Sequence, residues 1–188
     1  SDLVGELASQ SIKRVALELG GKSASVILED ADLAAAVKGS VSACMLNSGQ
    51  TCSAHTRMLV PESRYEEAKA LAQSAIAKFT LGPSLDENTR LGPLVSAAQR
   101  DRVLHFIEQG IKEGAEVIAG GPQKPPFEKG YFVQPTILRV KPTDTLAKEE
   151  IFSPVLVIIT YKDEQDAIRI DRKSTRLNSS HTDISRMP

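Results

Sequence analysis

The sequence has no apolar run near the ~20 residues that a membrane-spanning helix needs, and no excess of charge of either sign. Lys and Arg number 23 and Asp and Glu number 24, so the net charge is −1. This balance gives no electrostatic reason to bind nucleic acid or an anionic membrane. The N-terminus also lacks the basic and then apolar layout of a secretory signal. We therefore expect a soluble, cytoplasmic protein with neither nucleic acid nor membrane as partner.

Cysteine and histidine are scarce, with two and three copies in 188 residues. The histidines lie in unrelated contexts and no cysteines have the spacing of metal ligands, so we expect no metal site. Cys44 and Cys52 belong to a predicted helix and to the turn after it. A chain of this length can bury a core without a disulfide, so we expect reduced thiols. Free cysteines are most often small buried side chains, and this interpretation stays open for both.

Complete nucleotide-binding motifs are also lacking. The segment Gly20-Gly21-Lys22-Ser23 is similar to the end of a P-loop, but Ala16 stands where that motif has its first glycine. No G-x-G-x-x-G fingerprint occurs. We therefore reject a P-loop nucleotide triphosphatase, and expect no complete dinucleotide site within this sequence alone.

The apolar pattern changes repeatedly between the period of a strand and that of a helix. This alternation predicts an α/β fold: an open, mostly parallel sheet with flanking helices. Asp30 and Asp32 precede one helical run and Ser96 precedes another, as residues that begin helices do. We expect strands over residues 14–19, 23–28, 57–61 and 115–119 and within 131–140 and 151–161, and helices over 1–13, 34–46, 65–79 and 97–113 and from 163.

Two short segments combine a reactive side chain with a glycine turn. Glu18 ends a β-like run in LELGGKS, and Cys52 follows 34 residues later in the turn NSGQTCSA. A thiol in such a turn can be reached by a substrate and by backbone N–H donors, so it can act as a nucleophile. A lone carboxylate beside two glycines is more often a solvated strand end. Together the two groups are a possible nucleophile and general base.

The two segments resemble the glutamate and cysteine signatures of the aldehyde dehydrogenase superfamily in residue type, order and spacing. A third segment, EEIFSPV at residues 149–155, is similar to the family's EEIFGPV, with Ser153 in place of glycine. Three motifs in one order argue against chance agreement. The resemblance covers about residues 1–170, and implies an incomplete aldehyde dehydrogenase catalytic domain.

The resemblance implies oxidation of an aldehyde to a carboxylic acid with NAD or NADP, in a parent enzyme that is a homo-oligomer. It implies that Cys52 is the nucleophile that forms a thiohemiacetal and then a thioester. It implies that Glu18 activates the water that hydrolyses the thioester. The cofactor contacts that it implies come from Leu19, Gly20, Glu150 and Phe152.

Some residues are weaker candidates or depart from the family pattern. Arg102 is a possible cofactor contact, although a helix cation is more often only solvated. Met45 and His55 are unusual beside the cysteine turn, and Ser153 can alter the backbone beside Phe152. None of these departures removes a reacting group.

The resemblance divides the sequence into three parts. Residues 1–13 are expected to end a cofactor-binding domain, residues 14–170 to form a partial catalytic domain, and residues 171–188 to be an unstructured tail. The tail is rich in Ser, Arg and Thr and resembles translated vector or adaptor sequence, with a disordered natural terminus as the alternative. Family elements that bind adenine, and an asparagine of the oxyanion hole, would precede Ser1. We therefore expect this chain alone to be inactive.

Two alternatives to a hydrolytic dehydrogenase remain. An acylating dehydrogenase would pass the acyl group to coenzyme A, and such an enzyme has little use for a base such as Glu18. A fragment with only a structural or binding role is disfavoured because both reacting groups are present. The identity of the aldehyde, and the choice between NAD and NADP, are not encoded in these segments.

Overall fold

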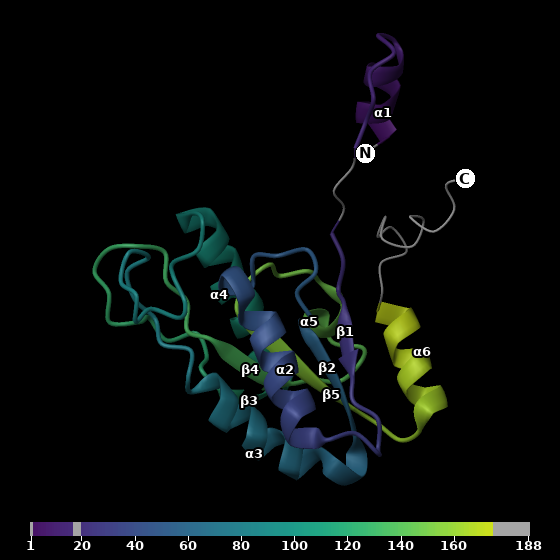
Figure 1. Ribbon diagram of the computed structural model, residues 1–188, viewed down its shortest axis with the longest axis vertical. Helices are drawn as coiled ribbons and strands as arrows, with labels where there is room; N and C mark the ends of the chain where they lie inside the picture. The colour runs from purple at the N-terminus through teal and green to yellow at the C-terminus, as the bar shows by residue number, and fades with distance from the viewer. Residues whose placement is uncertain (1, 17–19, 175–188) are drawn as a thin grey trace.

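The structure is a computed structural model that describes residues 2–16 and 20–174. A five-stranded sheet forms its centre (Figure 1). The strand order is β1-β2-β5-β4-β3. All neighbours pair in parallel except β3, which is antiparallel to β4 at one edge. The predicted α/β class with a mostly parallel sheet is confirmed. The strands are β1 Ala24–Val26, β2 Arg57–Pro61, β3 Glu116–Ala119, β4 Thr136–Arg139 and β5 Val155–Tyr161.

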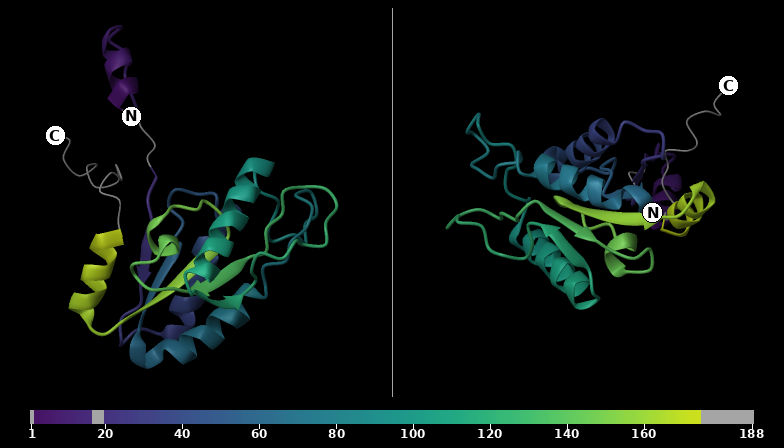
Figure 2. Two further views of the ribbon diagram at one scale, coloured as in Figure 1. Left: turned by 180° about the vertical axis from the view of Figure 1, so that it is seen from behind. Right: turned by 90° about the horizontal axis from the view of Figure 1, so that it is seen from below.

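Helices cover both faces of the sheet (Figure 2). The helices α2 Leu33–Met45 and α3 Tyr65–Ile76 pack on one face, and α4 Ala97–Lys112, α5 Thr145–Lys148 and α6 Glu164–Ser174 on the other. Short 3-10 turns, η1 Leu46–Gly49 and η2 Glu62–Arg64, follow α2 and β2. The helix α1 Asp2–Ser9 stands apart from the sheet in Figure 1.

The central strand β5 explains how one sheet supports two cores. Leu156 and Ile158 belong to the apolar cluster under α2 and α3, whereas Val155, Val157 and Ile159 belong to the cluster under α4, α5 and α6. Successive side chains of a strand point to opposite faces, so a strand between two helix layers must be apolar at nearly every position. The run VLVIIT has this composition.

Most predicted elements are confirmed, with boundaries that differ by a few residues. Asp32 caps α2 by accepting a hydrogen bond from the amide of Ala35, and Ser96 caps α4 in the same way at Gln99. The short helix α5 was not predicted. Residues 14–16 form no strand, and the rest of that predicted strand, with Glu18 and Leu19, lies outside the described residues.

The predicted boundary at Ile170 needs a correction, because α6 continues to Ser174. Asp171 lies in that extension and forms an ion pair of 2.8 Å with Arg57, whose side chain is fully buried. A buried guanidinium needs such a partner, which gives the first turn of the predicted tail a structural role. Residues 175–188 of that tail lie outside the described residues. No helix in the described ranges is long and apolar enough to cross a membrane.

Candidate active site

The amino ends of β1, β2 and β5 form one edge of the sheet, and the described parts of the three motif segments converge there. Gly20 stands shortly before β1, Cys52 before β2, and Phe152 before β5. Since β1, β2 and β5 are parallel neighbours, residues that precede them lie at the same edge. Open parallel sheets more commonly bind ligands at the carboxyl ends of their strands. The convergence here is at the amino ends, which the sequence did not predict.

The two cysteines occupy different environments. Cys52 lies in a turn closed by the Ala54 amide, which donates to the Thr51 carbonyl over 3.1 Å, and its side chain is partly exposed. Cys44 is fully buried in α2, and burial raises the pKa of its thiol to about 12. A thiol with that pKa is almost wholly protonated at neutral pH and has no access to a substrate. Of the two cysteines, only Cys52 is therefore accessible from outside the core.

An unusual backbone conformation precedes Cys52. Asn47, Ser48 and Gly49 have φ values of 51°, 55° and 71°, all in the left-handed region. This region is unfavourable for residues other than glycine, by about 1 kcal/mol or more each. Two hydrogen bonds to a separate loop stabilise this strained turn. The Ser48 hydroxyl donates to the Gly92 carbonyl at 3.0 Å. The Val95 amide donates to Oε1 of Gln50 at 3.0 Å.

The cysteine turn also packs against the third motif. A Cβ built on Gly49 would lie 2.0 Å from the carbonyl oxygen of Ser153 and 2.6 Å from the nitrogen of Pro154. Only glycine permits this approach, and its positive φ gives a second reason for glycine here. The backbone before β5 therefore supports the backbone before β2.

The first and third motifs meet as well. A Cβ built on Gly20 would lie 1.8 Å from Oε2 of Glu150, so the carboxylate rests against the glycine backbone. Glu150 is partly exposed and Phe152 is 37% exposed, so both can meet a ligand. Leu19 and Glu18 lie outside the described residues, and their predicted roles stay predictions.

A buried cation lies beneath this edge. Lys22 is 1% exposed, and its Nζ has no hydrogen-bond partner among the described residues. Burial lowers the pKa of Lys22 from 10.5 to about 8, against a smaller opposing effect of Cys44 and of the carboxylates of Glu150 and Glu149. The carbonyl of Lys22 accepts a hydrogen bond of 2.8 Å from Nε of Arg57. The sequence singled out this lysine only for its resemblance to a P-loop.

Phe152 has a φ of 60°, which is also left-handed. Two side chains of α4 donate to the loop that carries it. Nε2 of Gln99 lies 2.9 Å from the carbonyl oxygens of both Ile151 and Phe152. Arg102 donates from Nη1 to the Ile151 carbonyl at 2.8 Å and from Nη2 to the Glu150 carbonyl at 2.9 Å. The interpretation of Arg102 as a merely solvated cation is therefore wrong.

Sequence reasoning missed Gln99. The available signal was its position three residues after the cap Ser96, where a Gln commonly folds back onto the N-cap. Here the Gln99 side chain reaches the loop before β5 instead. Among residues 2–16 and 20–174, no group of three or more His, Cys, Asp or Glu is arranged to hold a metal ion.

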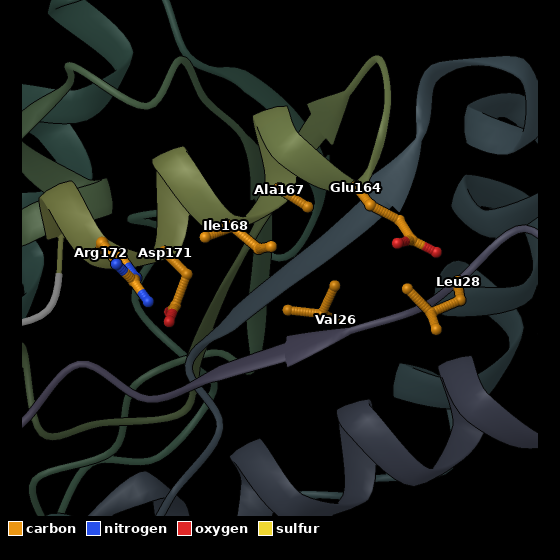
Figure 3. Close-up of a pocket in the computed structure, with 7 residues that line it drawn as sticks. All are labelled: Val26, Leu28, Glu164, Ala167, Ile168, Asp171 and Arg172. Carbon is orange, nitrogen blue, oxygen red and sulfur yellow. The ribbon is translucent and has the colours of Figure 1, made fainter.

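A cavity of about 380 Å³ lies elsewhere, between β1 and α6 (Figure 3). On the strand side Val26 lies opposite Ala167 and Ile168 of the helix, and Leu28 lies opposite Glu164. None of the residues that line it belongs to the three motifs. The chemistry-bearing side chains are therefore not in this cavity, and we assign it no part in the site.

Known proteins resemble this chain in sequence and structure. The aldehyde dehydrogenase family model matches residues 1–180. A 3-succinoylsemialdehyde-pyridine dehydrogenase from a Pseudomonas species is 48% identical over 174 residues, which are 92% of this chain and 36% of the relative.

Two solved structures show the same likeness. One is a mutant of aldehyde dehydrogenase C from Pseudomonas syringae in complex with NAD+ and octanal, with a TM-score of 0.85 and 42% identity over 90% of this chain and 36% of that chain. The other is a Mycobacterium tuberculosis aldehyde dehydrogenase complexed with NAD+, with a TM-score of 0.84 and 45% identity over 90% of this chain and 35% of that chain. This chain spans about a third of the length of these relatives.

Proposed function

Because the chain belongs to the aldehyde dehydrogenase family, we propose that it supplies the catalytic cysteine of an enzyme that oxidises an aldehyde to a carboxylic acid. The observation that carries this proposal is the meeting of three motifs at the amino ends of β1, β2 and β5. There a partly exposed thiol, a carboxylate and an aromatic ring share one edge. The activity is that of a full-length protein, since this chain spans about a third of its relatives.

Cys52 is the nucleophile in this proposal. Its thiolate adds to the aldehyde carbon, a C–S bond forms, and the carbonyl electron pair moves onto oxygen. Backbone N–H groups of the turn, including that of Cys52, can stabilise this oxyanion. When the oxyanion collapses, the aldehyde C–H bond breaks with loss of hydride, which leaves a thioester on the sulfur. Cys44 is excluded from this role by complete burial.

NAD or NADP is the proposed cofactor, and the residues present fit its nicotinamide end. When bound, the oxidised nicotinamide supplies the hydride acceptor. The Glu150 carboxylate offers acceptor oxygens for ribose hydroxyls, and the Phe152 ring offers apolar surface for the nicotinamide ring. Because Gly20 has no Cβ, the Glu150 carboxylate can lie against its backbone. By family resemblance Leu19 is a further contact.

Glu18 is the proposed general base. A carboxylate can take a proton from water as the water attacks the thioester carbon, and the thiolate of Cys52 then leaves. This role favours hydrolysis over transfer of the acyl group to coenzyme A, in which no water needs activation. The carboxylic acid and the reduced cofactor then depart, Glu18 releases its proton to solvent, and the free thiolate of Cys52 is restored.

The test uses a full-length protein, either the reading frame that contains this sequence or a full-length relative in which it replaces the matching segment. Reduced cofactor should form in the presence of an aldehyde such as octanal. Cys52→Ala should abolish the reaction, and Cys44→Ala should retain it. Turnover by Cys52→Ala at the unmodified rate would refute the proposed nucleophile.

A further inference from the structure

We propose that Gln99 and Arg102 are positioning residues that hold the backbone of residues 150–152, and through it fix Glu150 and Phe152 for the cofactor. We call the two side chains the α4 clamp. The cofactor part rests on the proposed function. The clamp itself is a property of this chain and can be tested without any cofactor.

The hydrogen bonds of the α4 clamp converge on three consecutive carbonyl groups. Gln99 binds the carbonyls of Ile151 and Phe152, and Arg102 binds those of Glu150 and Ile151, all at 2.8–2.9 Å. Residues 149–154 belong to no helix or strand. Their polar groups therefore depend on side chains or solvent instead of a regular backbone ladder.

The loop needs such restraint because Phe152 is left-handed, with a φ of 60°. A conformation of this kind persists only where the surroundings determine it. The carbonyl of Phe152 is itself held by Gln99, and the preceding carbonyl by both clamp residues. Release of these bonds would allow Phe152 to relax and would move Glu150 away from Gly20.

Arg102 is suited to this task by its shape. Its guanidinium uses two nitrogens of one planar fork to reach two successive carbonyls, which the single ammonium of lysine cannot reproduce. The guanidinium also lies 4.8 Å from the centre of the Phe106 ring, one turn along α4. Stacking on that ring orients the fork before any ligand binds.

Gln99→Glu is the sharpest variant, because it keeps the size of the side chain and turns the donor into an acceptor. A glutamate at this third helical position should also preserve or strengthen α4, beside the cap Ser96. Arg102→Lys keeps the charge and removes the fork. Arg100→Lys is the matched control, since Arg100 lies on the same helix but binds Asp101 instead of the loop.

The first measurement is amide hydrogen exchange of peptides covering residues 149–155 in the 188-residue chain. Each lost hydrogen bond should raise local opening by roughly fivefold. Compared with the unmodified protein, we expect exchange at least about fivefold faster in Gln99→Glu and Arg102→Lys. Arg100→Lys should exchange at the unmodified rate. Exchange at the unmodified rate in both clamp variants would overturn the clamp.

The second measurement is the Kd for NAD+ and NADP+ in the full-length protein, with the alkylation rate of Cys52 as a check on the rest of the site. The clamp variants should weaken cofactor binding roughly fivefold or more, with an unchanged alkylation rate and melting temperature. Faster exchange with unchanged cofactor affinity would overturn the positioning role. If the unmodified full-length protein binds neither cofactor, the proposed function fails, whereas the exchange result still decides on the clamp.

Discussion

Glu150 rests against Gly20, so that a Cβ at position 20 would fall 1.8 Å from its Oε2. The two residues are far apart in the sequence, and each stands before a strand at the same edge of the sheet. The contact joins the glutamate-glycine motif to the EEIF motif through one glycine.

Gly20→Ala should therefore impair cofactor binding more than folding. The atoms that a methyl group would displace are the end of a flexible side chain, so stability should change by less than about 1 kcal/mol. Displacement of the carboxylate should remove a charge-assisted hydrogen bond to ribose and raise the Kd for the cofactor by roughly tenfold or more. Gly21→Ala is the control, because a Cβ there meets nothing within 4 Å. Equal effects of the two variants would contradict this role of Gly20.

Gly49→Ala should destabilise the fold strongly. Its methyl group would lie 2.0 Å from the backbone oxygen of Ser153, and the φ of +71° disfavours any side chain. The backbone atoms of Ser153 and Pro154 cannot rotate away from this methyl group. We therefore expect a loss of about 2–4 kcal/mol in the free energy of unfolding. Urea denaturation measures it. Gly39→Ala, where a Cβ meets nothing within 4 Å in α2, should instead gain about 0.5–1 kcal/mol.

Much of this architecture was readable from the sequence because the signals are local. The caps Asp32 and Ser96 and the apolar run of β5 predicted their elements, since capping and side-chain alternation act within a few residues. The predictions that Cys52 and Gly20 are site residues came from motif resemblance. Their convergence did not, because it depends on the strand order β1-β2-β5, which brings distant segments together.

The features that the sequence did not predict are contacts between residues far apart along the chain. The bonds from Gln99 and Arg102 to residues 150–152 link positions about fifty residues apart, and no pattern in either segment records them. The same is true of the ion pair between Arg57 and Asp171, which lies in the part of α6 beyond the predicted boundary. Asp171 looked like part of a polar tail only because its partner is far away in the sequence.

Lys22 should make stability depend on pH. Its pKa is about 8 in the folded protein and 10.5 when exposed, chiefly because of burial. Between these values the unfolded chain binds more protons, so the contribution of Lys22 to stability rises with pH from about 8 to 10.5. Below about 8 the cost of the buried ammonium is fully present, at about 3 kcal/mol for a shift of this size.

Lys22→Met removes that cost. The variant should be more stable than the unmodified protein at pH 7 by up to about 3 kcal/mol, and the difference should shrink as pH rises toward 10.5. Cys44 is present in both proteins and contributes the opposite slope above 9.0, because burial raises the pKa of its thiol to about 12 against a smaller lowering by Lys22. Urea denaturation from pH 6 to 10 measures the difference, with the exposed Lys78→Met as control. A difference that is constant with pH would contradict the account.

The two thiols should differ in reactivity in the 188-residue chain itself. Brief treatment with iodoacetamide, followed by peptide mapping, should label Cys52 and leave Cys44 unmodified. The reason is that Cys52 is partly exposed in a turn whereas Cys44 is buried with a pKa near 12. Denaturation should make the two equally reactive. Preferential labelling of Cys44 in the folded chain would overturn the assignment.

The central claim is that an acyl group becomes covalently attached to Cys52 and is released by water that Glu18 activates. Loss of a general base slows its step by about a hundredfold to ten-thousandfold. In a full-length protein, Glu18→Gln should therefore give a burst of reduced cofactor and then a slow steady state. Intact-mass spectrometry with an aldehyde that the full-length protein oxidises, followed by peptide mapping, should find one acyl group of that aldehyde on Cys52. Full steady-state turnover of Glu18→Gln with no adduct, or an adduct on any other residue, would contradict the account.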